Sequence, residues 1–188
     1  EGMQSIKKSD RYLSIIENEN LKLKKQVEEI LQLGRYEQNT YQLDIQLCQI
    51  SDCIHEAAAE LAINYPDSKL NYKVLGKADE TALADPNHLR NVFLNLFENV
   101  LKYCPDNQSV SIKISKVRNK VSVDFSDSGP GIPPKHQKKV FKRFYRVPVS
   151  DTHQVKGFGI GLFYVRFILR KMNGRIKLIK SDNTGTTF

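Results

Sequence analysis

Three short polar motifs lie in a fixed order along the chain, and their residue types suit the parts of a nucleotide. They are Asn95-Leu-Phe-Glu-Asn99, Asp127-Ser-Gly-Pro-Gly131 and Gly157-Phe-Gly-Ile-Gly161. A polar helix face can hold a metal ion, an acidic turn can hold a base, and a glycine-rich turn can hold phosphates. Each motif alone is weak, but their order within about one domain's length of chain favours an ATP site.

The first motif lies on a predicted helix. Asn95 and Asn99 share one face of that helix because they are four residues apart, and Lys102 and Tyr103 follow one turn later. An Asn carbonyl is a hard, neutral ligand for Mg²⁺, and the Lys102 ammonium is a point charge suited to a phosphate oxygen. Taken alone, these residues also fit the solvated face of an amphipathic helix.

The two glycine-rich turns offer different groups to a ligand. Gly129 and Gly131 let the backbone turn tightly after Asp127, whose carboxylate can accept a hydrogen bond from an amine such as that of adenine. The turn from Gly157 to Gly161 precedes a predicted helix, and the free N–H groups at a helix start can hold phosphate. Its spacing is neither that of a P-loop nor that of a dinucleotide fingerprint.

A strongly basic segment lies between these two turns. From Pro133 to Lys156 the chain has seven Lys or Arg residues and one acidic residue, Asp151, within a net charge of +8. Such a segment can be a solvated face, a nucleic-acid patch or a phosphate clamp. Its position between a base turn and a phosphate turn favours a lid that brings Arg146 or Arg143 to the γ-phosphate. No recognised nucleic-acid fold accompanies it, so we expect no nucleic-acid partner.

The motifs need a scaffold, which the hydrophobic periodicity and the capping signals predict. Asp85-Pro86 is a specific helix start, because Asp is a favoured N-cap and Pro a favoured first helical residue. We predict helices over 9–35, 51–62, 86–104 and 160–172, and strands over 41–48, 70–75, 81–84, 110–117, 121–125 and 175–180, with a last strand near 185. The predicted fold class is α+β, a two-layer α/β sandwich with a mixed sheet and helices on one face, preceded by one long helix.

Length and composition set further bounds. The 188 residues allow one well-packed domain plus an appendage, and the wide apolar stripe of the N-terminal helix favours a helical hairpin or four-helix bundle. The longest apolar stretch near the C-terminus, 160–169, is too short to span a bilayer. Three cysteines without C-x-x-C spacing argue against a disulfide framework or a zinc site and fit a reducing cytosol.

Together these residues resemble the catalytic, ATP-binding domain of bacterial sensor histidine kinases, within the gyrase–chaperone–MutL ATPase superfamily. Asn95 to Tyr103 is similar to the family's N-box, and Asp127 to Gly131 is similar to its adenine-binding glycine motif. Phe141 to Arg146 resembles the phenylalanine-rich lid segment, Gly157 to Gly161 the second glycine box, and 185–187 the last one.

The resemblance implies a role for each matching residue. Asn99 would bind Mg²⁺, Arg146 would contact the γ-phosphate, and Glu98 is a candidate acid/base or orienting group. The implied catalytic residues are Asn95, Glu98, Lys102 and Arg146. The implied nucleotide-binding residues are Asn99, Tyr103, Asp127, Gly129, Gly131, Arg143, Gly157, Gly159, Gly161, Leu162 and Thr186. Phe158 departs from the small or hydroxyl residue that is usual at its position.

Position 95 separates the kinases from their relatives, since the hydrolytic members of the superfamily have a Glu there that activates water. Asn95 therefore implies slow bulk hydrolysis of ATP. The resemblance implies a protein-histidine kinase, a transferase that moves the γ-phosphoryl of ATP to a histidine and then to a response-regulator aspartate in two-component signalling. The alternative is a nucleotide-sensing or hydrolytic ATPase module of the same superfamily.

The resemblance also accounts for the N-terminal helix, because residues 11–36 look like the second helix of the dimerisation and phosphoacceptor hairpin. It divides the chain into 1–38, a partial hairpin, and 39–188, the catalytic domain. The implied partners are ATP, a response regulator and the protein's own hairpin in a homodimer. The implied location is the cytoplasmic part of an inner-membrane receptor, with this fragment soluble.

None of the histidines in the chain has the sequence context of the family's phosphoacceptor. They are His55, His88, His136 and His153. We expect each of them to be a surface or packing residue, and we expect no self-phosphorylation of this chain.

Overall fold

The computed structural model describes residues 42–77, 79–104, 108–148 and 158–188, together with Tyr12, Leu13, Ile16 and Asn20. The chain divides into two compact units, Glu1–Gln42 and Leu43–Phe188. The long helix predicted over 9–35 lies outside the described residues, apart from the four named, which are helical. The fold and the site below belong to the second unit.

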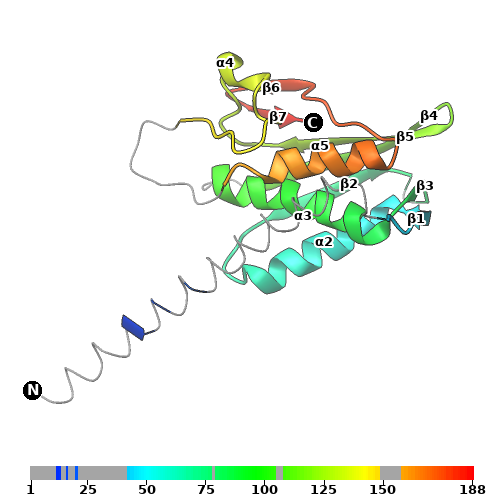
Figure 1. The fold of residues 1–188 in the computed structure, drawn as a ribbon, viewed down its shortest axis with the longest axis horizontal. Coiled ribbons are helices and arrows are strands. Elements are labelled where there is room, and N and C mark those ends of the chain that lie inside the picture. The colour runs from blue at the N-terminus through cyan, green and yellow to red at the C-terminus, as the bar shows by residue number, and fades with distance from the viewer. Residues whose placement is uncertain are drawn as a thin grey trace, which may run out of the picture. The chain divides into compact units, whose positions relative to one another are not determined.

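The second unit is built from strands and helices in mixed order (Figure 1). The helices are α2 (Ile50–Asn64), α3 (Pro86–Tyr103), α4 (Pro134–Gln137) and α5 (Gly161–Lys171). The strands are β1 (Gln46–Gln49), β2 (Asn71–Gly76), β3 (Thr81–Ala84), β4 (Ser109–Val117), β5 (Lys120–Asp127), β6 (Lys180–Asp182) and β7 (Gly185–Thr187). In the described part of the chain, no helix is long and apolar enough to cross a membrane.

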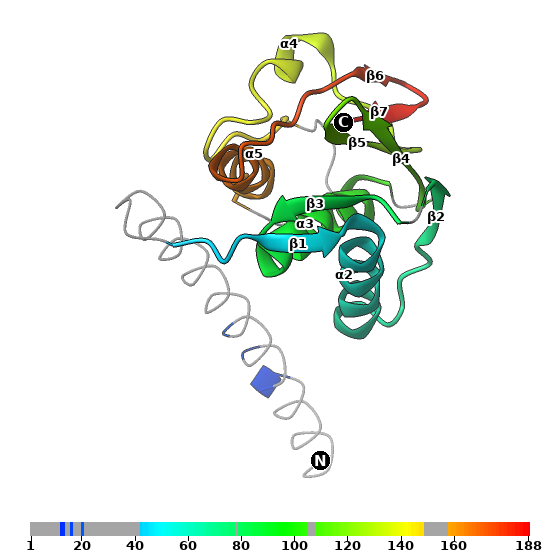
Figure 2. The same cartoon turned by 90° about the vertical axis from the view of Figure 1, so that its right-hand side faces the viewer.

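The strands form a five-stranded sheet in the order β2-β4-β5-β7-β6 and a separate antiparallel pair, β1 with β3. In the larger sheet β2 pairs with β4 in parallel, while every other pairing is antiparallel, so the sheet is mixed. Helices α2, α3 and α5 lie on one side of it (Figures 1 and 2). This arrangement confirms the predicted α+β sandwich.

The core lies between this sheet and α3. Phe97 on α3 is completely buried, and its ring packs edge-on against Tyr72 of β2 and Phe125 of β5. On β4 the buried residues are Val110, Ile112 and Ile114, which alternate as the period of a strand requires. One face of α3 is therefore held against the sheet, and the other face is left for the site.

The start of α3 is as predicted. Asp85 is the N-cap, and its Oδ1 accepts a hydrogen bond from the N–H of His88 at 3.1 Å. Its Oδ2 accepts from the N–H of Asp44 at 3.0 Å, and its own N–H lies 3.3 Å from Met172 Sδ, just after α5. One capping residue thus ties the start of α3 to the segment before β1 and to the end of α5.

Two predicted strands are wrong in their extent. Residues 42–45 are not strand, because β1 has only the four residues that pair with the short β3, from Gln46 opposite Ala84 to Gln49 opposite Thr81. The strand predicted over 175–180 begins only at Lys180, because its partner β7 is three residues long. Both segments have the side-chain pattern of a strand, but the strand pairings of the described residues do not include 42–45 or 175–179. In the second segment the N–H of Ile179 still donates to the carbonyl of Thr187 at 2.8 Å.

Candidate nucleotide-binding site

The polar face of α3 places the half-buried Asn95 next to the start of α5. The Asn95 Nδ2 donates to the carbonyl of Asn91 at 2.8 Å, as an amide does when it bonds back along its own helix. Its Oδ1 lies 2.8 Å from the position that a Cβ on Gly161 would occupy. A side chain at position 161 would therefore force the Asn95 side chain to shift, whereas glycine lets the turn lie directly against α3.

Asn99, one turn further along α3, has an incompletely used side chain. Its Nδ2 is buried and has no hydrogen-bond partner among the described residues. A buried amide without a partner costs free energy, which a ligand can recover. No group of three His, Cys, Asp or Glu side chains in the described ranges could hold a metal ion alone. A cation here would depend on the Asn99 carbonyl and on phosphate oxygens, and that donor set fits Mg²⁺.

Lys102 is held by another residue of its own helix. Its Nζ lies 2.9 Å from Glu98 Oε2, and Tyr65 Oη donates to Glu98 Oε1 at 3.4 Å. Leu101 and the turn after α2 border the same place, where residues 64–68 line a hollow of about 410 Å³. Glu98 is therefore engaged on both carboxylate oxygens, and one of them holds Lys102 in an ion pair.

The acidic turn after β5 is fixed by hydrogen bonds to its carboxylate. Asp127 Oδ1 accepts from the N–H of Gly129 at 2.9 Å and from the N–H of Thr186 at 3.1 Å. Burial raises the pKa of Asp127 above its usual value, although these two hydrogen bonds oppose that shift. The carboxylate joins the first glycine turn to β7, and Oδ2 takes part in neither of these two hydrogen bonds.

The glycines of this turn are required by close backbone contacts. Gly131 has a φ of +74°, and a Cβ there would lie 1.9 Å from the carbonyl oxygen of Asp182. A Cβ on Gly129 would lie 2.5 Å from the sulfur of Cys104. Burial raises the pKa of that thiol to about 12, so the Cys104 side chain that contacts the turn is uncharged at neutral pH. The turn is thus packed against α3 on one side and β6 on the other.

The two arginines of the lid segment are placed differently. Burial raises the pKa of the Tyr103 phenol above its usual value. Arg146 lies close enough that its charge opposes this shift, but burial has the larger effect. The Arg143 guanidinium lies 4.8 Å from the Phe144 ring centroid and borders a hollow of about 680 Å³ with Phe163 of α5. Arg146 therefore acts electrostatically on Tyr103, the last residue of the N-box.

The second glycine turn is described from residue 158 onward, so Gly157 lies outside the described residues. Gly159 has a φ of +70°, and a Cβ there would lie 2.5 Å from the carbonyl oxygen of Tyr145. Leu162 lies half-buried in the first turn of α5. The N–H groups of that turn have no residues before them in the helix to accept their hydrogen bonds. The structure thus brings α3, both glycine turns and the lid segment together around one region.

A family model matches this part of the chain. Residues 84–188 match the family described as histidine kinase-, DNA gyrase B- and HSP90-like ATPase, which is more than half of the sequence. The chain belongs to this ATPase family. The match starts just before α3 and includes every site motif described above.

Individual relatives of this ATPase-family chain are named as a sensor protein and as a histidine-protein kinase. It is 30% identical over 179 residues to the sensor protein RprX of Bacteroides fragilis, covering 93% of this chain and 34% of that protein. It is 31% identical over 177 residues to the signal transduction histidine-protein kinase ArlS of Staphylococcus aureus, covering 94% and 39%. The chain thus spans between a third and two-fifths of the length of these relatives.

A solved structure shares the fold of this ATPase-family chain. Full-length ShkA in complex with AMPPNP has a TM-score of 0.68 to this chain at 20% sequence identity, covering 86% of this chain and 34% of that one. At this level of identity the likeness concerns the fold.

Three residues around the site were not among those that the motifs indicated. They are Tyr65, which bonds to Glu98, Ser181, whose Oγ lies 3.0 Å from Thr186 Oγ1, and His136, which bonds to Tyr145 in the lid segment. The expectation that His136 is a surface or packing residue missed this hydrogen bond. The motif spacing contains no signal for these contacts, because each joins residues from different elements.

Proposed function

We propose that this chain is the ATP-binding, catalytic part of a histidine protein kinase, with ATP held between α3 and the two glycine turns. Asp127 accepts the exocyclic amine of adenine through its second carboxylate oxygen. The phosphates lie toward Asn95, Lys102, Tyr103 and the N–H groups at the start of α5. The observation on which this proposal most depends is the contact between Asn95 and Gly161, since it joins the polar face of α3 to the phosphate turn.

The metal of this site is Mg²⁺, and Asn99 is its protein ligand. Held there by Asn99, Mg²⁺ would supply positive charge that neutralises the phosphates. Lys102 and Arg146 neutralise charge from the protein side, which is the main contribution of a protein to phosphoryl transfer. Asn95 has no carboxylate with which to activate water, so hydrolysis of ATP remains slow.

The acceptor of the phosphoryl group is a histidine on the protein's own dimerisation hairpin, from which the phosphoryl passes to an aspartate of a response regulator. The names of the relatives support this proposal, because RprX is a sensor protein and ArlS a signal transduction histidine-protein kinase. The hairpin forms a homodimer, and the part described here works on the cytoplasmic side of a membrane-anchored receptor. No nucleic acid takes part.

The test is a titration of the 188-residue chain with ATP by isothermal calorimetry, with and without Mg²⁺. We expect binding with a Kd of about 1–100 µM in the presence of Mg²⁺, corresponding to about −8 to −5 kcal/mol. Absence of binding at millimolar ATP contradicts the proposal.

A second experiment separates a kinase from an ATPase. We expect release of inorganic phosphate to be slow, and we expect no acid-labile label from γ-³²P ATP on this chain, because none of its histidines has the phosphoacceptor context. Fast phosphate release would identify a hydrolytic enzyme instead. The variant Asn95→Glu is the matched control, since it introduces the residue with which the hydrolytic members of the superfamily activate water.

A further inference from the structure

A hydrogen bond within the lid side of the site has no role in the function proposed above. It joins His136 Nδ1 and Tyr145 Oη, 2.5 Å apart, and the ring centroids of the two residues are 6.0 Å apart. His136 lies in α4 and is only 9% exposed. The bond gives the buried His136 imidazole a polar partner, and Tyr145 itself is half-buried.

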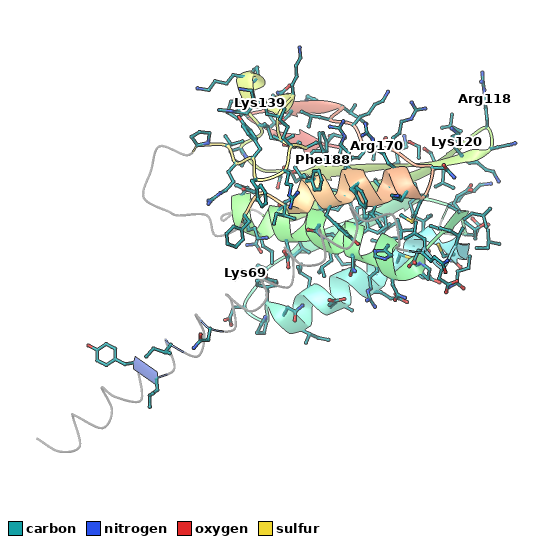
Figure 3. The ribbon with its side chains drawn as sticks, in the orientation of Figure 1. Lys69, Arg118, Lys120, Lys139, Arg170 and Phe188 are labelled. Carbon is teal, nitrogen blue, oxygen red and sulfur yellow. The ribbon has the colours of Figure 1, made fainter. Side chains whose placement is uncertain are left out.

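Tyr145 is held at three further points. The Nζ of Lys139, near α4 in Figure 3, lies 5.9 Å from the centroid of the Tyr145 ring. The N–H of Tyr145 donates to the carbonyl of Lys142 at 3.2 Å. Its carbonyl oxygen lies against Gly159, where a Cβ would come within 2.5 Å. Tyr145 therefore connects α4, the lid segment and the phosphate turn.

The residue that follows Tyr145 is Arg146, whose charge acts on Tyr103 at the end of α3. Arg146 is exposed and has a long side chain, so holding it in one place costs conformational entropy. An anchored backbone reduces the freedom that remains to be lost on binding. Fixing Tyr145 by its hydroxyl and its carbonyl fixes the point from which the Arg146 side chain begins.

We propose that His136 and Tyr145 form a positioning pair that holds Arg146 in place for the γ-phosphate. The pair does not touch the nucleotide and acts only through Arg146. This inference rests on the proposed function, because it needs ATP in the site and Arg146 at its γ-phosphate. Beyond that function, the inference is that the preference for ATP over ADP depends on the hydrogen bond between His136 and Tyr145.

The ratio of the ADP and ATP-analogue dissociation constants tests the proposal, because loss of structure weakens both ligands whereas loss of Arg146 positioning weakens mainly the one with a γ-phosphate. The 188-residue chain is titrated with Mg²⁺ and either ADP or a non-hydrolysable ATP analogue. We expect Tyr145→Phe to reduce the preference for the analogue about three- to tenfold, with less than about a twofold change for ADP.

Variants of His136 provide a rescue test. We expect His136→Ala to lower the preference as Tyr145→Phe does. His136→Asn places an amide near the position of Nδ1, so it can bond to the Tyr145 hydroxyl and restore most of the preference. If Tyr145→Phe melts at a lower temperature, the comparison of His136→Ala with His136→Asn decides the question. Equal ratios in these two variants overturn the proposal.

Tyr72→Phe is the matched control. It removes the same kind of bond, between Tyr72 Oη and His55 Nδ1 at 2.9 Å, which joins α2 and β2 away from the lid segment. We expect it to leave the ratio unchanged. A fall equal to that of Tyr145→Phe would mean that any lost His–Tyr bond has this effect, and the proposal would be wrong.

Arg146→Ala separates failure of this inference from failure of the proposed function. Absence of nucleotide binding by the wild-type chain overturns both. If Arg146→Ala abolishes the preference for the analogue while Tyr145→Phe keeps it, the ATP site stands and the positioning role is wrong. If Arg146→Ala keeps the preference for the analogue over ADP, Arg146 does not bind the γ-phosphate, and the positioning role is wrong as well.

Discussion

The proposed adenine end of the site and its proposed phosphate end are constructed in different ways. The adenine end consists of Asp127, the first glycine turn and Thr186, and it is held by two backbone N–H bonds to one carboxylate oxygen. The phosphate end consists of side chains on α3 and in the lid segment. There Asn99 Nδ2 has no partner among the described residues, and Lys102 is bound to Glu98.

The difference indicates where binding changes the protein. Gly131 fits so closely against Asp182 that the adenine turn has little room to rearrange. At the proposed phosphate end, we expect Lys102 to exchange its ion pair with Glu98 for a phosphate oxygen and the Asn99 amide to gain a partner. In this proposal the adenine end is preformed, and the phosphate end is completed by its ligand. Four predictions test this contrast.

The largest effect is expected at the adenine end. Asp127→Ala removes the acceptor of adenine and of two backbone N–H groups, so ATP affinity should fall at least about a hundredfold and the free energy of unfolding by about 1–3 kcal/mol. Calorimetry and urea denaturation measure the two effects. Asp127→Asn keeps an acceptor for the N–H groups of Gly129 and Thr186, so stability should recover while affinity stays about tenfold lower. Wild-type affinity in Asp127→Asn would show that the carboxylate does not bind the exocyclic amine of adenine.

Acidification should weaken binding at the same residue. Because burial raises the pKa of Asp127, its carboxylate takes up a proton at a higher pH in the folded chain than in the unfolded one. Affinity should therefore fall, by up to the factor that Asp127→Asn costs, as the pH falls through that raised pKa. Between the unfolded and the folded pKa, this proton uptake stabilises the folded state as the pH falls. Protonation of Asp127 therefore does not cause unfolding. A titration of Asp127→Asn should be flat over the same range, and an equal decline there would assign the effect to another group.

At the phosphate end, Asn99→Ala should remove most of the gain in affinity that Mg²⁺ provides, about fivefold. ATP binding without Mg²⁺ should change little. Stability should change by less than about 0.5 kcal/mol, because the buried nitrogen has no partner to lose in the described structure. Asn87→Ala, at an exposed position of the same helix, is the control. A full Mg²⁺ effect in Asn99→Ala would rule out Asn99 as the metal ligand.

The smallest effect is expected at Glu98. Glu98→Gln releases Lys102 from its ion pair, so affinity for ATP should rise about two- to threefold while stability falls by no more than about 1 kcal/mol. Glu60→Gln breaks a comparable pair with Arg90, 3.4 Å apart, and should leave affinity unchanged. Lower affinity in Glu98→Gln would mean that Glu98 itself contacts the ligand or its water.

The contrast also explains what could be predicted from the sequence. The helix from Pro86 and the positions of Asp127 and Gly131 follow from local rules, since a cap, a proline and a left-handed glycine act within a few residues. The strand predicted over 175–180 was mostly wrong because a strand also depends on its partner strand, and here the partner β7 has only three residues.

Side-chain partners were the least predictable part of the site. The motifs indicated Glu98 and Lys102 as site residues. The hydrogen bond from Tyr65, in the turn after α2, to Glu98 could not be predicted from the motif spacing. The same holds for His136 and Tyr145, whose contact depends on how the lid segment folds. The adenine end, made by backbone and glycines, could therefore be predicted more fully than the phosphate end.

A crystal structure of the chain with a non-hydrolysable ATP analogue and Mg²⁺ tests the central claim most directly. We predict that the Asp127 turn keeps its hydrogen bonds to Gly129 and Thr186, that Asn99 contacts Mg²⁺, and that Lys102 leaves Glu98 for a phosphate oxygen. A structure in which the nucleotide lies elsewhere, or in which Lys102 stays with Glu98 while the Asp127 turn rearranges, would contradict it.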